Sequence, residues 1–152
     1  MWFMNKIVNP VVRLILRSRL HKMMSASLLI ITCCGRKSGR AYSLPVQYAQ
    51  AGNIIYIVPG WPEQKTWWRN LKEAASVQLI LRGQAIAGNA RVLKADTDAD
   101  AIVAGFDLYL RRFPAAAKVH QLLPAADGSF KAEELRRAAL QAVIIHVELN
   151  QP

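Results

Sequence analysis

Residues 28–58, which read LLIITCCGRKSGRAYSLPVQYAQAGNIIYIV, decide the fold class of this chain. The stretch holds three runs rich in apolar and β-branched residues, and such runs are typical of strands. The runs cover 28–34, 42–49 and 54–58, and glycine-containing turns at 35–40 and 52–53 separate them. Because strands joined by such short turns pair antiparallel, we expect an antiparallel sheet over this part of the chain.

The rest of the chain adds three strands and several helices to this sheet. Apolar, β-branched runs predict strands at 77–82, 85–94 and 143–149. Helical signals, among them an Asp-rich start near residue 96 and a stop at Pro114, predict helices over 65–74, 97–113, 115–122 and 131–140. We therefore expect an α+β fold in which six strands form a barrel.

Length and composition restrict the classes of protein to which the chain can belong. With 152 residues, of which 53% are hydrophobic and 20% charged, it fits one globular domain over 1–152. Within it we expect a helical segment over 1–24 and a barrel with helices over 25–152. No apolar run reaches the ~18 residues that span a bilayer. The adjacent Cys33 and Cys34 are too few for a zinc site and the histidines are scattered, so we expect no bound metal.

Basic residues gather in the first part of the chain. The net charge is +10, and eight Lys or Arg residues precede Glu63, the first acidic residue. The segment 11–24 has apolar and basic positions at helical spacing, which predicts an amphipathic helix. Such a helix can lie on anionic lipid or pack on the barrel, and both interpretations remain open. The charge asymmetry predicts an anionic partner, which is nucleic acid, a membrane surface or a phosphorylated small molecule.

The turn at 35–40, with the sequence GRKSGR, is the most informative motif. Its glycines let backbone N–H groups converge, Ser38 adds a hydroxyl, and Arg36 and Lys37 add positive charge. The turn can therefore bind a phosphate, although its residue order is not that of a nucleotide-binding Walker loop. An exposed basic hairpin without a ligand explains this composition equally well.

The segment 60–71, GWPEQKTWWRNL, holds three of the four tryptophans. An indole ring offers a flat apolar surface to a planar ligand, and Lys65 and Asn70 can reach its polar substituents or a phosphate. Alternatively, Trp67 and Trp68 cover one end of the barrel as part of its core. The segment thus predicts either a site for a heteroaromatic ring or a hydrophobic plug.

Together with Leu44-Pro45-Val46, these two segments resemble the deazaflavin-dependent nitroreductase family of the split β-barrel flavin-binding superfamily. The resemblance runs from Asn9-Pro10 to Arg91-Val92-Leu93 and fades over the last third of the chain. It implies a six-stranded antiparallel Greek-key split barrel of the FMN-binding type. An N-terminal amphipathic helix and helices in the C-terminal region would accompany this barrel. The implied cofactor is 8-hydroxy-5-deazaflavin, coenzyme F-420.

The resemblance also implies which residues bind the cofactor. The basic turn is similar to a site for the phosphate and acidic tail, and Pro45 and Val46 lie along the ring in such a site. With Lys65 added from the tryptophan segment, the candidate cofactor-binding residues are Arg36, Lys37, Ser38, Gly39, Pro45, Val46, Pro59, Gly60, Lys65, Trp67 and Asn70. Tyr109 is the candidate that faces the substrate, and no catalytic residue is assigned.

The function that the resemblance implies is hydride transfer from a reduced deazaflavin to a quinone, a nitroaromatic or an activated alkene. FMN is the alternative cofactor, because the basic turn fits its phosphate as well, and a split-barrel protein that binds FMN or another ring cofactor is an alternative function. A non-enzymatic basic domain that binds a membrane surface or nucleic acid is the other alternative. Nucleic acid is disfavoured because the tryptophans lie in an apolar context and the basic residues are mostly on one helix and one turn, not interleaved with exposed aromatic residues. We expect a cytoplasmic chain with a peripheral contact to the inner face of the membrane through residues 5–24, and a homodimer by analogy of fold.

Overall fold

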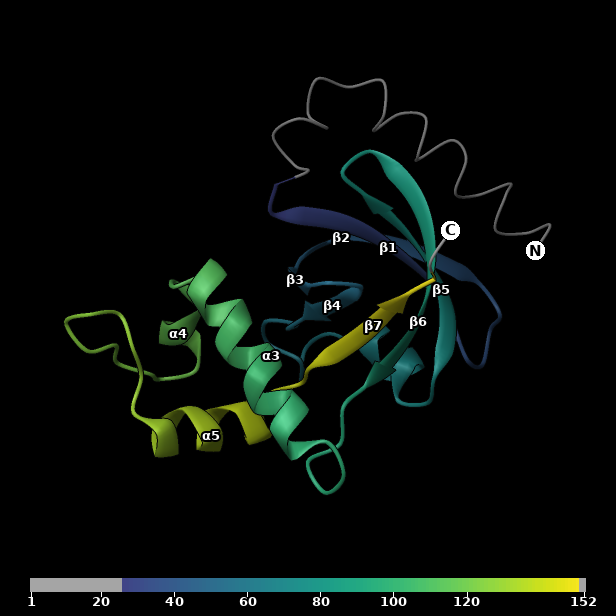
Figure 1. The fold of residues 1–152 in the computed structure, drawn as a ribbon. Helices are drawn as coiled ribbons and strands as arrows, with labels where there is room; N and C mark the ends of the chain where they lie inside the picture. The colour runs from purple at the N-terminus through teal and green to yellow at the C-terminus, as the bar shows by residue number, and fades with distance from the viewer. Residues whose placement is uncertain (1–25, 151–152) are drawn as a thin grey trace.

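The computed structural model describes residues 26–150, in which a curled antiparallel sheet is flanked by helices (Figure 1). Within these residues seven strands pair in the order β2-β1-β5-β6-β7-β4-β3. The strands are β1 (Leu28–Cys34), β2 (Ala41–Gln47), β3 (Ala49–Ala51), β4 (Ile54–Ile57), β5 (Ala75–Leu81), β6 (Gln84–Val92) and β7 (Ile145–Leu149). The helices are the 3-10 helix η1 (Trp67–Leu71), α3 (Ala99–Arg112), α4 (Ala116–Val119) and α5 (Ala132–Gln141). The predicted α+β class is confirmed.

The prediction of six strands is wrong, because the predicted strand 42–49 is two strands in the structure. β2 pairs with β1, whereas β3 pairs with β4 at the opposite end of the sheet. Tyr48 lies between β2 and β3 and is buried. The chain changes its pairing partner at Tyr48, so the two ends of the sheet meet there. Local periodicity does not reveal this change, because the sequence on both sides of Tyr48 is strand-like.

Two hydrophobic clusters hold the described residues together. The first joins alternate residues of the strands, among them Leu29 and Ile31 of β1 and Ile55 of β4, since alternate side chains of a strand share one face. The second lies between the sheet and the helices and contains Phe106 of α3 and Ala139 of α5. The helices α3, α4 and α5 therefore lie together on one side of the sheet, as Figure 1 shows, whereas η1 packs on the first cluster.

Close packing of α3 on β4 depends on a glycine. Gly105 is buried in α3, and a Cβ atom at this position would overlap the ring of Tyr56 in β4. Glycine lowers helix propensity by about 1 kcal/mol relative to alanine, so its place in the middle of a helix needs a packing reason. The contact with Tyr56 supplies that reason.

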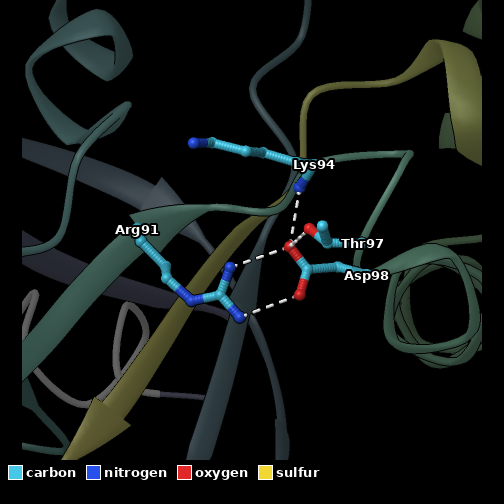
Figure 2. A network of polar contacts seen from close by, with 4 residues as sticks. All are labelled: Arg91, Lys94, Thr97 and Asp98. Carbon is cyan, nitrogen blue, oxygen red and sulfur yellow. Dashed lines mark hydrogen bonds and ion pairs between the residues drawn. The ribbon is translucent and has the colours of Figure 1, made fainter.

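An ion pair fixes the turn between β6 and α3 (Figure 2). The Arg91 guanidinium donates two hydrogen bonds to the Asp98 carboxylate, at 2.8 and 3.0 Å. The backbone N–H of Lys94 donates to the same carboxylate at 2.9 Å, and the Thr97 hydroxyl donates to it at 3.3 Å. These hydrogen bonds favour the ionised form and hold the pKa of Asp98 well below its usual value. The start of α3 is thus tied to the end of β6.

No helix in the described range 26–150 is long and apolar enough to cross a bilayer. The amphipathic helix predicted for 11–24 lies outside the described residues, as does the contact surface predicted for 5–24.

Candidate functional site

The basic turn between β1 and β2 is closed by its own backbone. The Gly35 N–H donates to the Arg40 carbonyl at 2.8 Å, and the Gly39 N–H donates to the Gly35 carbonyl at 2.9 Å. Gly39 has a φ of +65°, and a Cβ atom at Gly35 would lie 2.6 Å from the Ser38 hydroxyl oxygen. The positive φ favours glycine at position 39, and a larger residue at position 35 would displace the Ser38 side chain. The tight turn places Arg36 and Lys37, the two cations between these glycines, at the surface.

Asn70 connects this turn to η1. Its side-chain oxygen accepts a hydrogen bond from the backbone N–H of Arg36 at 3.1 Å. Its side-chain nitrogen donates to the carbonyl oxygen of Trp67 at 3.0 Å. The Trp68 indole N–H donates to the Pro62 carbonyl at 2.9 Å, which ties η1 to the preceding loop as well. Two segments separated by more than 30 residues in the sequence therefore form one unit.

A hollow of about 680 Å³ lies where the turn meets η1. Its lining residues are Gly35, Arg36, Lys37, Ser38, Tyr42, Thr66, Trp67, Arg69, Asn70 and Lys72. Four of these side chains are cationic and none is acidic. The Arg69 and Lys72 cations lie 5.8 and 5.7 Å from the centroid of the Trp68 ring, so η1 adds to the charge of the turn. We call this space the cationic hollow, and its charge favours an anionic ligand.

A second hollow, of about 900 Å³, lies beside the first and is mostly apolar. Its walls come from β2, the end of β4 and the loop after it, and the segment around α4. Trp67 lines both hollows, so they adjoin at this half-buried indole. Lys65 and Arg112 are the cationic residues of its lining, and the lining contains no acidic residue. We call this space the apolar hollow; its size and lining suit a ring system.

Tyr109 of α3 lines the apolar hollow and donates a hydrogen bond to the side-chain oxygen of Gln47, at 3.2 Å. Its ring packs on Phe113, with 5.0 Å between the ring centroids, and only 4% of the residue is exposed. Burial disfavours the charged phenolate and raises the pKa of Tyr109 to about 12. The hydroxyl therefore keeps its proton at physiological pH.

Almost all candidate residues named from the sequence line one of the two hollows. In the cationic hollow are Arg36, Lys37, Ser38 and Asn70. In the apolar hollow are Pro45, Val46, Pro59, Gly60, Lys65 and Tyr109. Trp67 belongs to both, whereas Gly39 lines neither and contributes to the turn through its backbone. The structure thus brings these side chains together from four separate segments of the chain.

Sequence reasoning missed several residues that line the hollows. Arg69 and Lys72 are three positions apart on and just after η1, a spacing that places side chains on one helix face and could have identified them. Gln47 follows Pro45 by two residues in β2, so strand periodicity could have placed it on the same face. Trp61 lines the mouth of the apolar hollow with 57% of its surface exposed and an unusual φ of +49°. The tryptophan segment as a whole predicts a surface for a ring, but Trp61 itself is not among the candidate residues named from the sequence.

The histidines of the described part do not form a metal site. The His120 ring lies edge-on to Phe106, with centroids 4.9 Å apart, and the His146 ring lies edge-on to Tyr56 at 5.8 Å. Burial lowers the pKa of both histidines, so they are neutral at physiological pH. Within residues 26–150, no group of three or more His, Cys, Asp or Glu side chains could hold a metal ion.

Three comparisons relate this chain to known proteins. A family model described as F420H(2)-dependent quinone reductase matches residues 17–104, which include the basic turn and η1. No curated protein matches the chain significantly. A solved structure described as an F420-H2 dependent reductase (FDR-A) is 17% identical, with a TM-score of 0.57, over 80% of this chain and 94% of that one. Another, described as a domain-swapped dimer, is 13% identical, with a TM-score of 0.59, over 95% and 98%. These two likenesses concern the fold.

Proposed function

The chain belongs to the F420H(2)-dependent quinone reductase family, and we propose that it performs this reaction in the two hollows that adjoin at Trp67. It is an oxidoreductase that uses a reduced deazaflavin. The observation that carries the assignment of the site is the division of charge between the hollows. One hollow has four cationic side chains and no acidic one, and its neighbour is mostly apolar.

The residues of both hollows fit coenzyme F-420. This cofactor joins a planar deazaflavin ring to a phosphate and a tail of carboxylates, so it needs an apolar surface next to a cationic one. In our proposal Arg36, Lys37 and Ser38 bind the anionic tail by charge and hydrogen bonds. Pro45 and Val46 contact the ring, and Trp67 lies where ring and tail meet. Neither hollow has a lining carboxylate that would repel the tail.

When bound, the reduced cofactor supplies a hydride to an electron-poor acceptor such as a quinone. The chain's own residues bind, orient and shield the reactants. The apolar wall formed by Pro59, Phe113 and their neighbours excludes water. Lys65 and Arg112, the cations of this hollow, stabilise negative charge that develops on an acceptor oxygen. Tyr109 stays protonated and provides a neutral polar group in the wall.

A fluorescence titration tests the proposed site. Purified protein is titrated with coenzyme F-420 and, in parallel, with FMN, and quenching of tryptophan fluorescence is followed, since Trp61 and Trp67 line the apolar hollow. We expect saturable binding of the deazaflavin. The double variant Arg36→Ala/Lys37→Ala should raise its dissociation constant about tenfold or more, which corresponds to ~1.4 kcal/mol, and flatten its salt dependence.

The matched control is Lys131→Ala/Arg137→Ala, which also removes two exposed cations but lies in neither hollow. This control should bind the cofactor like the unaltered protein. If the two double variants bind the cofactor with equal affinity, the basic turn is not part of the binding site. Tighter binding of FMN than of the deazaflavin would mean that FMN, and not coenzyme F-420, is the cofactor.

We also propose a position for the protein in the cell. The basic, amphipathic sequence of residues 5–24 supports a peripheral contact of a cytoplasmic protein with an anionic membrane, and the barrel fold supports a homodimer by analogy. Deletion of residues 1–24 should abolish sedimentation with vesicles that contain anionic lipid and leave cofactor binding intact. Loss of folding would instead mean that this segment packs on the barrel.

A further inference from the structure

We propose that Gln47 selects acceptors that carry a carbonyl group, because its side-chain amide donates a hydrogen bond to that carbonyl oxygen. Tyr109 is then a positioning residue, which orients the amide by a hydrogen bond to its oxygen. The inference rests on the proposed function, since it names a contact inside the same apolar hollow.

The backbone of Gln47 is fixed on both sides. Gln47 is the last residue of β2, where it pairs with Leu28 of β1. The next residue, Tyr48, is buried with 1% of its surface exposed. The side chain of Gln47 is exposed and lines the apolar hollow. Its Cα position is therefore set by the sheet, and the side chain is available to a ligand.

The hydrogen bond from Tyr109 decides which end of the amide is left for the ligand. The Tyr109 hydroxyl donates to the side-chain oxygen of Gln47 at 3.2 Å, across 62 positions in the sequence. Tyr109 itself is held, since it is almost completely buried and its ring packs on Phe113. A carboxamide has one accepting oxygen and two N–H donors. With its oxygen engaged by Tyr109, Gln47 offers donors, and donors suit a carbonyl oxygen.

Most of the other polar residues of the hollow do not offer the same chemistry, although the neutral ring of His120 and the indole N–H groups of Trp61 and Trp67 are further donors among its lining residues. Lys65 and Arg112 are cations, which favour negative charge over a neutral carbonyl. The hydroxyl of Tyr109 is already engaged with Gln47. Gln47 is the only carboxamide among the lining residues of the apolar hollow. An acceptor without a carbonyl would cover this amide and leave its N–H groups unpaired, which disfavours such a ligand.

Equilibrium dialysis with two ligands of the same shape tests the proposal. 1,4-Naphthoquinone carries two carbonyl groups, and naphthalene carries none. Binding is measured for the unaltered protein, Gln47→Met, Tyr109→Phe and the double variant, with Gln84→Met, an exposed glutamine outside both hollows, as control. We expect Gln47→Met to raise the dissociation constant of naphthoquinone about five- to tenfold, as loss of one hydrogen bond predicts. Naphthalene binding should not weaken.

The double variant separates positioning from simple packing. If Tyr109 acts through Gln47, Tyr109→Phe weakens naphthoquinone binding in the unaltered background but adds nothing to Gln47→Met. Full additivity of the two changes, or an equal loss for both ligands in Gln47→Met, would overturn the proposal. The dialysis is run with and without oxidised coenzyme F-420, whose own binding is measured first. Failure of the chain to bind the cofactor would refute the proposed function, and the ligand comparison would still report on Gln47.

Discussion

Replacing Asn70 by alanine should loosen the cationic hollow and destabilise the fold at the same time. The change removes the hydrogen bond from the Arg36 backbone at 3.1 Å and the one to the Trp67 carbonyl at 3.0 Å. A net value of about 0.5–1.5 kcal/mol for each bond, discounted because the side chain is half-buried, gives a loss of about 1–2 kcal/mol. At about 2–4 °C for each kcal/mol in a chain of this size, the melting temperature should fall by about 2–8 °C.

The same variant should weaken cofactor binding, because the turn would no longer be held against η1. We expect the dissociation constant of coenzyme F-420 to rise about tenfold in the fluorescence titration. Asn70→Asp is informative beside it, since aspartate keeps the acceptor for the Arg36 N–H but adds a negative charge to the cationic hollow. Asn70→Asp should therefore weaken binding at least as much as Asn70→Ala with a smaller loss of melting temperature.

Asn89→Ala is the matched control, because Asn89 is exposed on β6 and lines neither hollow. Thermal unfolding and titration of Asn70→Ala and Asn89→Ala are compared in one buffer. If both variants melt at the same temperature and bind the cofactor equally, the link between the turn and η1 does not support the site and the reasoning fails.

Three further changes test the packing and the ionisable groups. Gly105→Ala should cost about 1–3 kcal/mol, because the added Cβ overlaps the Tyr56 ring, and urea unfolding that shows no loss would contradict this packing. Tyr109 has its pKa raised from 10.0 to about 12, so its contribution to stability is intact below about pH 10 and is lost between pH 10 and 12. Tyr109→Phe should flatten the stability curve in that window. Asp98, whose pKa is lowered by Arg91, contributes stability that is present above its ordinary pKa of 3.8 and is lost as the pH falls further. Asp98→Asn should therefore lose stability at neutral pH and show a shallower acid transition, and an unchanged acid transition would count against the ion pair.

Local sequence signals were sufficient for most of the fold. Glycine turns such as Gly52, with a φ of +60°, and apolar runs such as 28–34 carry their information in a few neighbouring residues. The change of pairing partner at Tyr48 was not predictable in this way. It depends on which strand lies on each side of the chain, and that is decided by distant residues in β1 and β4.

The candidate site shows the same division between local and distant information. The cations of the basic turn and the indole of Trp67 were identifiable, because their residue types are unusual for a turn and a short helix. The contact between Gln47 and Tyr109 was not, since the two residues are 62 positions apart and only the packing of α3 on the sheet brings them together. Periodicity in β2 could have singled out Gln47 but not its partner.

The change of pairing partner at Tyr48 restricts how this chain can change in length during evolution. The stretch from Ala41 to Ala51 is paired along both ends of the sheet, and a one-residue insertion or deletion within β2 would turn Pro45 and Gln47 to the opposite face. Such an event would exchange the side chains that β2 contributes to the apolar hollow in a single step, whereas the turn at Gly52 can gain or lose residues at little cost. Relatives that keep the pocket should therefore vary in length at that turn and stay constant in length across Tyr48.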